Sequence, residues 1–207
     1  MNQRLLRNLR DAMRCSTTAM TAVFTIVVFA VFCDGEARSQ NEKQQPPATV
    51  AAKPDDVKSM EAILDALYNT ISGPAGGRDW DRLRSLFSAD ARLIPCIKGT
   101  RDQDKDAPAI RTRVLTVEQY IKLAEPRVKS EGFFEREIAR RVERFGAIAH
   151  VFSTYESRHS AADPQPFVRG INSIQLFFDG TRWWVVTIFW DSERPGQTIP
   201  EEYLPKQ

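Results

Sequence analysis

The sequence has few of the residues on which disulfide, metal and nucleophilic chemistry depend. Its 207 residues include three cysteines and two histidines. Cys15 and Cys33 belong to an N-terminal segment with export character, which leaves Cys96 without a disulfide partner in the rest of the chain. We therefore expect the folded part to be stabilised by packing alone. Because no histidine flanks Cys96, we interpret it as a small buried hydrophobe beside Ile94 and Ile97.

A charge excess of one sign is also lacking. The 29 basic and 27 acidic side chains leave a net charge of +2, too small to attract nucleic acid or an anionic surface. The chain has no glycine-rich phosphate loop, nucleophile elbow or close zinc-ligand spacing. Asp102, Asp104 and Asp106 alternate as calcium-loop ligands do. Ala107 and Arg113, however, stand where such a loop needs glycine and glutamate, so we expect no metal, no cofactor and no nucleic-acid partner.

The long apolar run of the sequence lies at its N-terminus. Four arginines between residues 4 and 14 precede an uncharged stretch from Cys15 to Cys33, which is typical of an export signal. The segment Ala37-Arg38-Ser39 offers small residues at the two positions that a signal peptidase reads. The sequence therefore predicts that residues 1–39 are a signal peptide or membrane anchor, and that the protein is exported, either periplasmic or secreted.

Three fates of this segment stay open. Cleavage fits the small residues near position 39. Retention as an anchor is the second, because the uncharged stretch approaches the roughly 20 residues that span a membrane. Lipidation at Cys33 is the third, although Phe32 is bulkier than the residue that usually precedes a lipidated cysteine. Residues 40–54 are polar and contain proline, so we expect a flexible linker, followed by one folded domain over residues 55–207.

Helices are predicted near the start of this domain and again in its middle. Apolar residues at three- and four-residue steps predict a helix from Asp55 to Ile71. Asp79 is expected to cap a second helix that ends near Phe87. Thr116 and Gln119 form a capping box for a third, which we expect to end near Pro126. Residues 134–145 fit a helix or a strand, with the spacing of the apolar residues favouring a helix.

Strands are predicted mainly in the C-terminal half. We expect strands over residues 91–97 and 147–158, the first at a sheet edge because of Pro95. Residues 167–191 predict a hairpin that turns at Asp179-Gly180. Strict alternation places Ser173, Gln175, Trp184 and Trp190 on one face of this hairpin. Neither face is polar enough for water, so one should meet helices and the other a pocket or a partner subunit.

The order of these elements resembles the nuclear transport factor 2-like superfamily, which includes SnoaL-like polyketide cyclases, ketosteroid isomerases and scytalone dehydratases. The resemblance covers most of residues 55–192. It is carried by four segments taken together: Glu61–Tyr68, Asp79–Phe87, Gly146–Glu156 and Gly180–Trp190. It implies an α+β cone, in which a curved antiparallel sheet packs on N-terminal helices around an internal pocket. It also implies that residues 134–145 form a strand and that the protein is a homodimer through the outer face of the sheet.

The resemblance says less about chemistry. Enzymes of this superfamily place a histidine or aspartate base and tyrosine or aspartate donors on cavity-facing strands. Relatives often carry histidines on the last strand, where this chain has Val186, Ile188 and Trp190. A tyrosine converging with two aspartates, as ketosteroid isomerases require, is not recognisable in the sequence. His150, on the strand over residues 147–158, is the weak candidate for a catalytic base, against an ordinary structural or surface role.

The sequence therefore favours ligand binding over catalysis. Polar residues among the aromatic residues of the hairpin could orient an apolar small molecule, or equally could pack a dimer interface. The candidate ligand-binding residues are Ser173, Gln175, Trp184, Trp190 and Tyr155. We expect an exported small-molecule-binding domain. The alternatives are an isomerase, dehydratase or cyclase that needs no cofactor and uses His150 or a carboxylate as base, and a structural or interaction module.

Mass spectrometry of the protein recovered from its native compartment tests the predicted export. We expect the mature chain to lack residues 1 to about 39, because signal cleavage removes them. An intact Met1 on protein recovered with membranes would contradict cleavage and favour the anchor.

Overall fold

A computed structural model of the chain describes residues 50–98 and 110–206. The predicted signal, most of the predicted linker, and Asp102, Asp104 and Asp106 lie outside the described residues. Within the described ranges, no helix is both long enough and apolar enough to cross a membrane.

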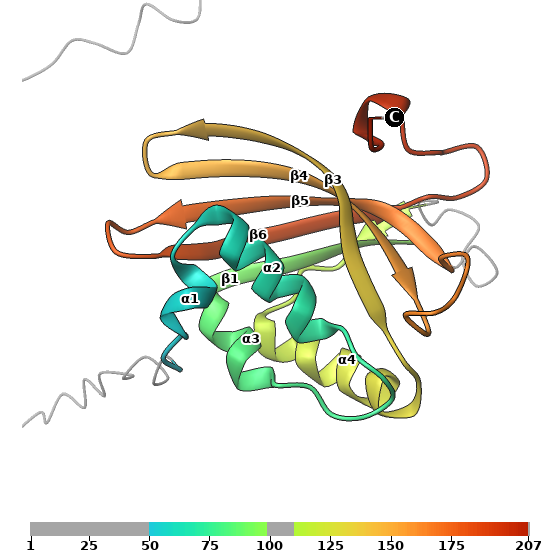
Figure 1. The fold of residues 1–207 in the computed structure, drawn as a ribbon, viewed down its shortest axis with the longest axis horizontal. Coiled ribbons are helices and arrows are strands. Elements are labelled where there is room, and N and C mark those ends of the chain that lie inside the picture. The colour runs from blue at the N-terminus through green and yellow to red at the C-terminus, as the bar shows by residue number, and fades with distance from the viewer. Residues whose placement is uncertain (1–49, 99–109, 207) are drawn as a thin grey trace, which may run out of the picture. The chain divides into compact units, whose positions relative to one another are not determined.

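The described part of the domain is α+β, as the sequence predicts, with helices and strands joined mainly by short connections (Figure 1). The helices are α1 (Pro54–Val57), α2 (Met60–Ile71), α3 (Trp80–Leu86) and α4 (Val117–Ser130), with the short 3-10 helix η1 (Glu201–Tyr203) near the C-terminus. The strands are β1 (Phe87–Lys98), β2 (Ile110–Thr112), β3 (Phe134–Phe145), β4 (Ile148–Arg158), β5 (Val168–Phe178) and β6 (Trp183–Ser192).

The strands form one open, curved sheet in the order β2-β1-β6-β5-β4-β3. Consecutive pairs from β3 to β6 are antiparallel, whereas β1 lies parallel to β6. The sheet is therefore mixed, where the sequence predicts antiparallel strands. Sequence patterns do not predict the parallel pairing of β1 with β6, because these strands are far apart in the chain and no tight turn joins them.

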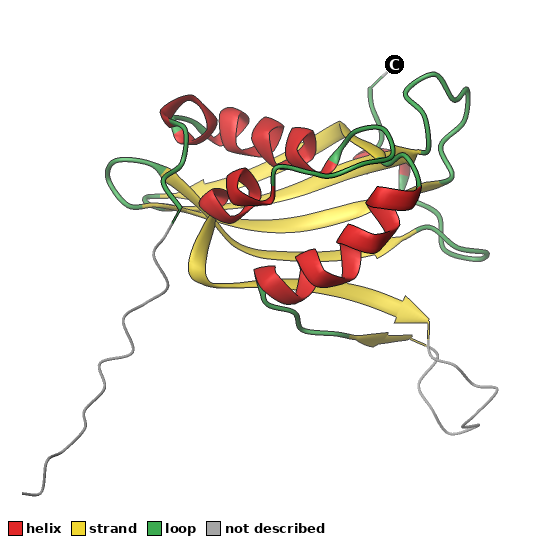
Figure 2. Cartoon of the chain, turned by 90° about the horizontal axis from the view of Figure 1, so that it is seen from below, coloured by secondary structure: helices red, strands yellow, loops and turns green. Residues whose placement is uncertain are grey.

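Helices α2, α3 and α4 lie on the same face of the sheet, which we call the inner face (Figure 2). The core forms where they pack on β4, β5 and β6, and its fully buried side chains include Ile63, Leu83, Val151, Ile174 and Val185. The opposite, outer face carries none of these three helices; there the short η1 packs on β4, where Tyr203 contacts Phe152 and its backbone oxygen accepts a hydrogen bond from Thr154. One face of the hairpin thus meets the helices, as expected.

Two of the helices have boundaries that differ from the sequence prediction. The expected helix from Asp55 to Ile71 is broken, because the Ser59 hydroxyl accepts a hydrogen bond from Ala62 N and starts α2 as a separate helix. Helix α4 begins at the predicted capping box but continues past Pro126 to Ser130. Its last turn is stabilised because Val128 is buried. Helix α3 and its Asp79 cap are confirmed.

The strands follow the prediction with one exception of position. Residues 134–145 form strand β3, which confirms the choice that the resemblance favours and not the helix that the spacing of apolar residues favours. Strand β1 is longer than expected and lies between β2 and β6, so the prediction that Pro95 confines it to the edge is wrong. The short β2 pairs with β1 only from Cys96 onward, so the pairing requires no backbone N–H donor at Pro95.

A β-bulge in β6 changes which residues share a face. Gln175 pairs with Thr187, but Leu176 pairs with Val185, so one residue of β6 is unmatched. Beyond this point the alternation is shifted by one residue, and Trp190 pairs with the buried Asn172 on the inner face. The prediction that Trp190 shares a face with Ser173, Gln175 and Trp184 is therefore wrong.

Candidate functional site

A group of polar side chains lies on the inner face, where β3, β4 and β5 meet α2 and α4. We call it the inner cluster; its members are Tyr68, Tyr120, Glu135, Ser153, Tyr155, Ser157 and Asn172. Ser153 and Ser157 are fully buried, and Tyr68, Tyr155 and Asn172 nearly so. Polar groups at such depth need partners, so their arrangement is the most informative feature of the fold.

Glu135 is the acidic group at the centre of the inner cluster. Its backbone is fixed by Ser72, whose hydroxyl donates to Glu135 O and accepts from Glu135 N, each at 2.9 Å. The Ser157 hydroxyl donates to Glu135 Oε2 at 2.8 Å. Burial raises the pKa of Glu135 to about 7, although Ser157 and Asn172 act in the opposite direction by favouring the carboxylate.

Three tyrosines surround this carboxyl group. Burial raises the pKa of Tyr68, Tyr120 and Tyr155, and the charge of Glu135 adds to each shift. All three therefore stay protonated near neutral pH. Tyr68 shares a hydrogen bond with Ser153 at 2.6 Å, and Tyr155 shares one with Ser192 at 2.8 Å.

Tyr120 differs from the other two tyrosines. In the described residues no hydrogen bond involves its hydroxyl, and its ring meets the edge of Trp190 at 6.4 Å between centroids. Tyr120, Glu135 and Trp190 each keep some accessible surface. These three side chains are therefore not sealed in the core.

Close packing fixes Tyr155 over β5. It pairs across the strands with Gly170, and a Cβ atom at Gly170 would lie 2.6 Å from the Tyr155 hydroxyl oxygen and 2.3 Å from Asp191 O. Only glycine leaves room for this arrangement.

The inner cluster is suited to proton transfer. A carboxyl group with a pKa near neutrality is present in both protonation states, as a general acid or base requires. Protonated phenols can donate hydrogen bonds to an oxygen on which negative charge develops. Within residues 50–98 and 110–206, no group of three or more His, Cys, Asp or Glu is arranged to hold a metal ion.

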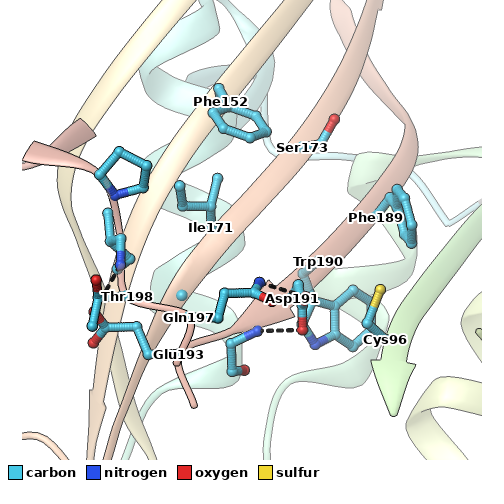
Figure 3. A pocket seen from close by; sticks show the side chains of 14 residues that line it. Cys96, Phe152, Ile171, Ser173, Phe189, Trp190, Asp191, Glu193, Gln197 and Thr198 are labelled. Atoms are coloured by element: carbon cyan, nitrogen blue, oxygen red, sulfur yellow. Dashed lines mark hydrogen bonds between the residues drawn. The ribbon is translucent and has the colours of Figure 1, made fainter. Parts of the chain in front are cut away.

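A separate hollow lies on the outer face of the sheet (Figure 3). Its volume is about 320 Å³, and its walls come from β4, β5, β6, Cys96 of β1 and residues 197–200. Phe152, Ile171, Phe189 and Trp190 supply apolar surface. Its two acidic groups already have hydrogen-bond donors: Asp191 accepts from Arg194 at 2.7 Å and from Gln197 at 3.1 Å, and Glu193 accepts from Arg169 at 2.8 Å. A second, more polar hollow of about 470 Å³ lies beside Glu156, Arg158 and residues 165–169.

The structure divides the predicted ligand-binding residues between these places. Ser173 and Trp190 line the hollow of Figure 3. Gln175 and Trp184 lie on the outer face, where the Trp184 indole donates to Asp179 at 2.6 Å. Tyr155 belongs to the inner cluster. Their roles in binding stay predictions.

His150, the predicted weak candidate for a base, lies on the outer face. Its Nε2 is 2.9 Å from Ser173 Oγ, and its Nδ1 is 3.7 Å from Glu143. It is therefore separated by the sheet from Glu135.

Sequence reasoning missed the inner cluster. Tyr68 lies on the apolar face of its helix, Asn172 stands within an apolar strand, and Glu135 is one of several charged residues in β3. A polar residue at an inward position of each element could have indicated the cluster. The inward positions of β3 could not be assigned, however, until that segment was known to be a strand.

Glu135 should also change how stability depends on pH. Its pKa is about 7 in the folded chain against 4.5 for an unperturbed glutamate, so the folded state binds the proton more tightly than the unfolded state. Its contribution to stability is present below about pH 4.5 and is lost as pH rises to about 7. Relative to wild type, we expect Glu135→Gln to gain up to about 3 kcal/mol in unfolding free energy between pH 4.5 and 8.

Urea unfolding across this pH range measures the difference. Glu143→Gln is the matched control, because Glu143 lies exposed on the same strand. A Glu135→Gln curve parallel to wild type at all pH values would show that Glu135 titrates normally.

Comparison with known proteins gives similar folds and no similar sequences. No protein-family model matches the chain, and no curated protein matches it. Among solved structures, a nuclear transport factor 2-like protein of unknown function from Silicibacter pomeroyi is 14% identical, with a TM-score of 0.45 over 66% of this chain and 94% of that chain.

Two further solved structures have similar folds. A nuclear transport factor 2-like protein of unknown function from Shewanella baltica is 12% identical, with a TM-score of 0.42 over 64% of this chain and 89% of that chain. A protein with a ketosteroid isomerase-like fold from Catenulispora acidiphila is 17% identical, with a TM-score of 0.36 over 62% of this chain and 83% of that chain. These likenesses concern the fold alone and assign no family and no activity to this chain.

Proposed function

We propose that the chain is an acid–base enzyme of the isomerase, dehydratase or cyclase kind that acts on a small, mainly apolar molecule. The observation that carries the proposal is Glu135, a half-buried carboxyl group whose pKa desolvation raises to about 7, among three protonated tyrosines. A carboxyl group that is largely withdrawn from water and has no cationic partner is costly to keep, and groups with shifted pKa values gather at functional sites.

In this mechanism Glu135 moves a proton and Tyr120 stabilises charge. The Glu135 carboxylate takes a proton from a carbon next to a substrate carbonyl group, and the electron pair of the broken C–H bond moves toward the carbonyl oxygen. The Tyr120 hydroxyl, which has no partner among the described residues, donates a hydrogen bond to that oxygen. The protonated Glu135 then returns the proton to another carbon or to a leaving hydroxyl group.

The surroundings favour a mainly apolar substrate. Trp190 and the apolar residues of the core border the inner cluster, and the sheet separates it from the charged side chains of the outer face. An apolar wall with a few convergent polar groups is the usual form of a small-molecule site.

Binding without catalysis is the second candidate, and the hollow of Figure 3 favours it. Its volume of about 320 Å³ is at the lower end of ligand sites, which hold roughly 300 to 1,000 Å³. Ser173 and Trp190, two of the predicted ligand-binding residues, contribute to its walls.

Deuterium uptake from D2O by a panel of small ketones, followed by NMR, tests the acid–base proposal. We expect the wild-type chain to catalyse exchange at the carbon next to the carbonyl group, and Glu135→Gln to lower the rate by about 10² to 10⁴, the usual contribution of a general base. Glu143→Gln and His150→Gln should keep the wild-type rate because both residues lie across the sheet. The proposal fails if wild type exchanges no ketone or if Glu135→Gln is as fast as wild type.

We also propose that the protein works outside the cytosol. The arginines and the apolar stretch within residues 1–33 support export. The lone Cys96 in the rest of the chain is compatible with an oxidising compartment, because it has no partner for an unwanted internal disulfide.

A second copy of the chain is the partner that we propose for the outer face. Phe145, Ile148 and Phe177 lie next to one another on neighbouring strands and are 83%, 60% and 41% exposed. Exposed apolar side chains gathered on three strands are typical of an association surface.

Sedimentation velocity of residues 50–207 tests this association. We expect wild type to sediment as a dimer and Phe177→Lys as a monomer, because a charge in the interface is costly. Leu123→Lys, at a 49% exposed position on helix α4, is the control and should leave the dimer intact. A monomeric wild type, or a dimeric Phe177→Lys, contradicts the proposal.

A further inference from the structure

Five side chains of the inner face form a continuous chain of hydrogen bonds, which we call the inner chain: Arg140, Glu137, Ser153, Tyr68 and Asn172. It joins β3, β4, helix α2 and β5. Arg140 and Glu137 form an ion pair at the more exposed end of this chain of hydrogen bonds, whereas Ser153, Tyr68 and Asn172 are buried. The acid–base step described above uses Glu135 and Tyr120 and leaves these five residues without a role.

The direction of each hydrogen bond follows from the charge at the Glu137 end. A carboxylate only accepts, so Ser153 donates to Glu137, as Arg140 also does. The single proton of Ser153 is then committed, and at 2.6 Å its oxygen must accept from Tyr68. The single proton of Tyr68 is committed in turn, so its oxygen accepts from Asn172 Nδ2 at 3.1 Å.

This order fixes the orientation of the Asn172 amide. The amide nitrogen, and not the carbonyl oxygen, is turned toward Tyr68. The Asn172 side chain also favours the carboxylate form of Glu135, as a hydrogen-bond donor does. Because burial raises the pKa of Tyr68, its proton stays in place near neutral pH and the order persists.

We propose that Glu137 and Arg140 are positioning residues: through Ser153 and Tyr68 they orient the Asn172 amide toward Glu135, and so set the protonation of Glu135 from a distance. The catalytic consequence rests on the proposed function, whereas the hydrogen-bond order does not. Tyr68, on this account, is a relay and not a donor to substrate, because its only proton is used by Ser153.

Replacing Glu137 by its isosteric amide should reverse the whole order. In Glu137→Gln, Arg140 still donates to the side-chain oxygen, which turns the new NH2 group toward Ser153. Ser153 then accepts and donates to Tyr68, Tyr68 donates to the Asn172 carbonyl oxygen, and the amide turns over. Glu135 loses an amide donor and meets a carbonyl oxygen, which favours its protonated form.

The sign of the change in the Glu135 pKa distinguishes reversal of the inner chain from the simple loss of a negative charge at Glu137. Removing the negative charge of Glu137 would by itself favour ionisation of Glu135 and lower its pKa. Reversal of the inner chain raises it. The other titratable groups that surround Glu135, namely Tyr68, Tyr120 and Tyr155, stay protonated near neutral pH and are the same in both chains.

Carbon-13 NMR titration of the Glu135 carboxyl group in residues 50–207, with the Asn172 side-chain amide signals recorded in parallel, is the test. We expect the Glu135 midpoint to rise by roughly half a pH unit or more in Glu137→Gln, with a changed Asn172 amide shift. Ser153→Ala, which breaks the inner chain without changing any charge, should move both signals in the same direction. Glu143→Gln, which removes an exposed charge from the same strand, should move neither.

The proposal is overturned if the Glu135 midpoint in Glu137→Gln is lowered or unchanged and the Asn172 signals do not move. If Glu137→Gln fails to fold, Ser153→Ala decides: a lowered or unchanged Glu135 midpoint with unmoved Asn172 signals in that variant also overturns the proposal. The titration needs no substrate. If the midpoints shift as expected but Glu135→Gln keeps the exchange rate of wild type, the proposed function fails and the inner chain stands.

Discussion

Burial of the Glu135 carboxyl group is the constraint on which the rest of the site depends. A charge at this depth is costly unless it is neutralised or supplied with donors. The structure does both in part: burial raises the pKa of Glu135 toward neutrality, while Ser157 and Asn172 still favour the charged form. The balance leaves a group that can take up and release a proton, at the place where the curved sheet meets α2 and α4.

The fold supplies this balance from widely separated parts of the chain. Tyr68 and Asn172 are 104 residues apart in the sequence, and Tyr68 and Ser153 are 85 apart. Their side chains are nevertheless joined by hydrogen bonds on the inner face of the sheet. Gly170 leaves the space that Tyr155 occupies, and the bulge in β6 turns Trp190 inward against Tyr120. The outer face, by contrast, carries His150 and the exposed Phe145 and Phe177, so the proposed proton chemistry and the proposed association lie on opposite faces.

The sequence patterns were sufficient for most elements but not for the break between α1 and α2, for strand β3, or for the mutual geometry of the strands. Local patterns gave the capping box of α4, the Asp79 cap and the hairpin, because each depends on residues a few positions apart. The bulge could not be predicted, since no glycine or proline marks it between Trp183 and Trp190, and it reversed the face assigned to Trp190. The role of Glu135 depends on four elements meeting, which no single segment encodes.

The titration of Glu135 in the wild-type chain tests the central claim most directly. With the glutamate carboxyl carbons labelled and Glu135 assigned by its absence in Glu135→Gln, the account predicts a midpoint at about pH 7. A midpoint near 4.5, the ordinary value for glutamate, would contradict this expectation, because an ordinary carboxylate would carry a fixed charge at neutral pH and would be a poor proton-transferring group.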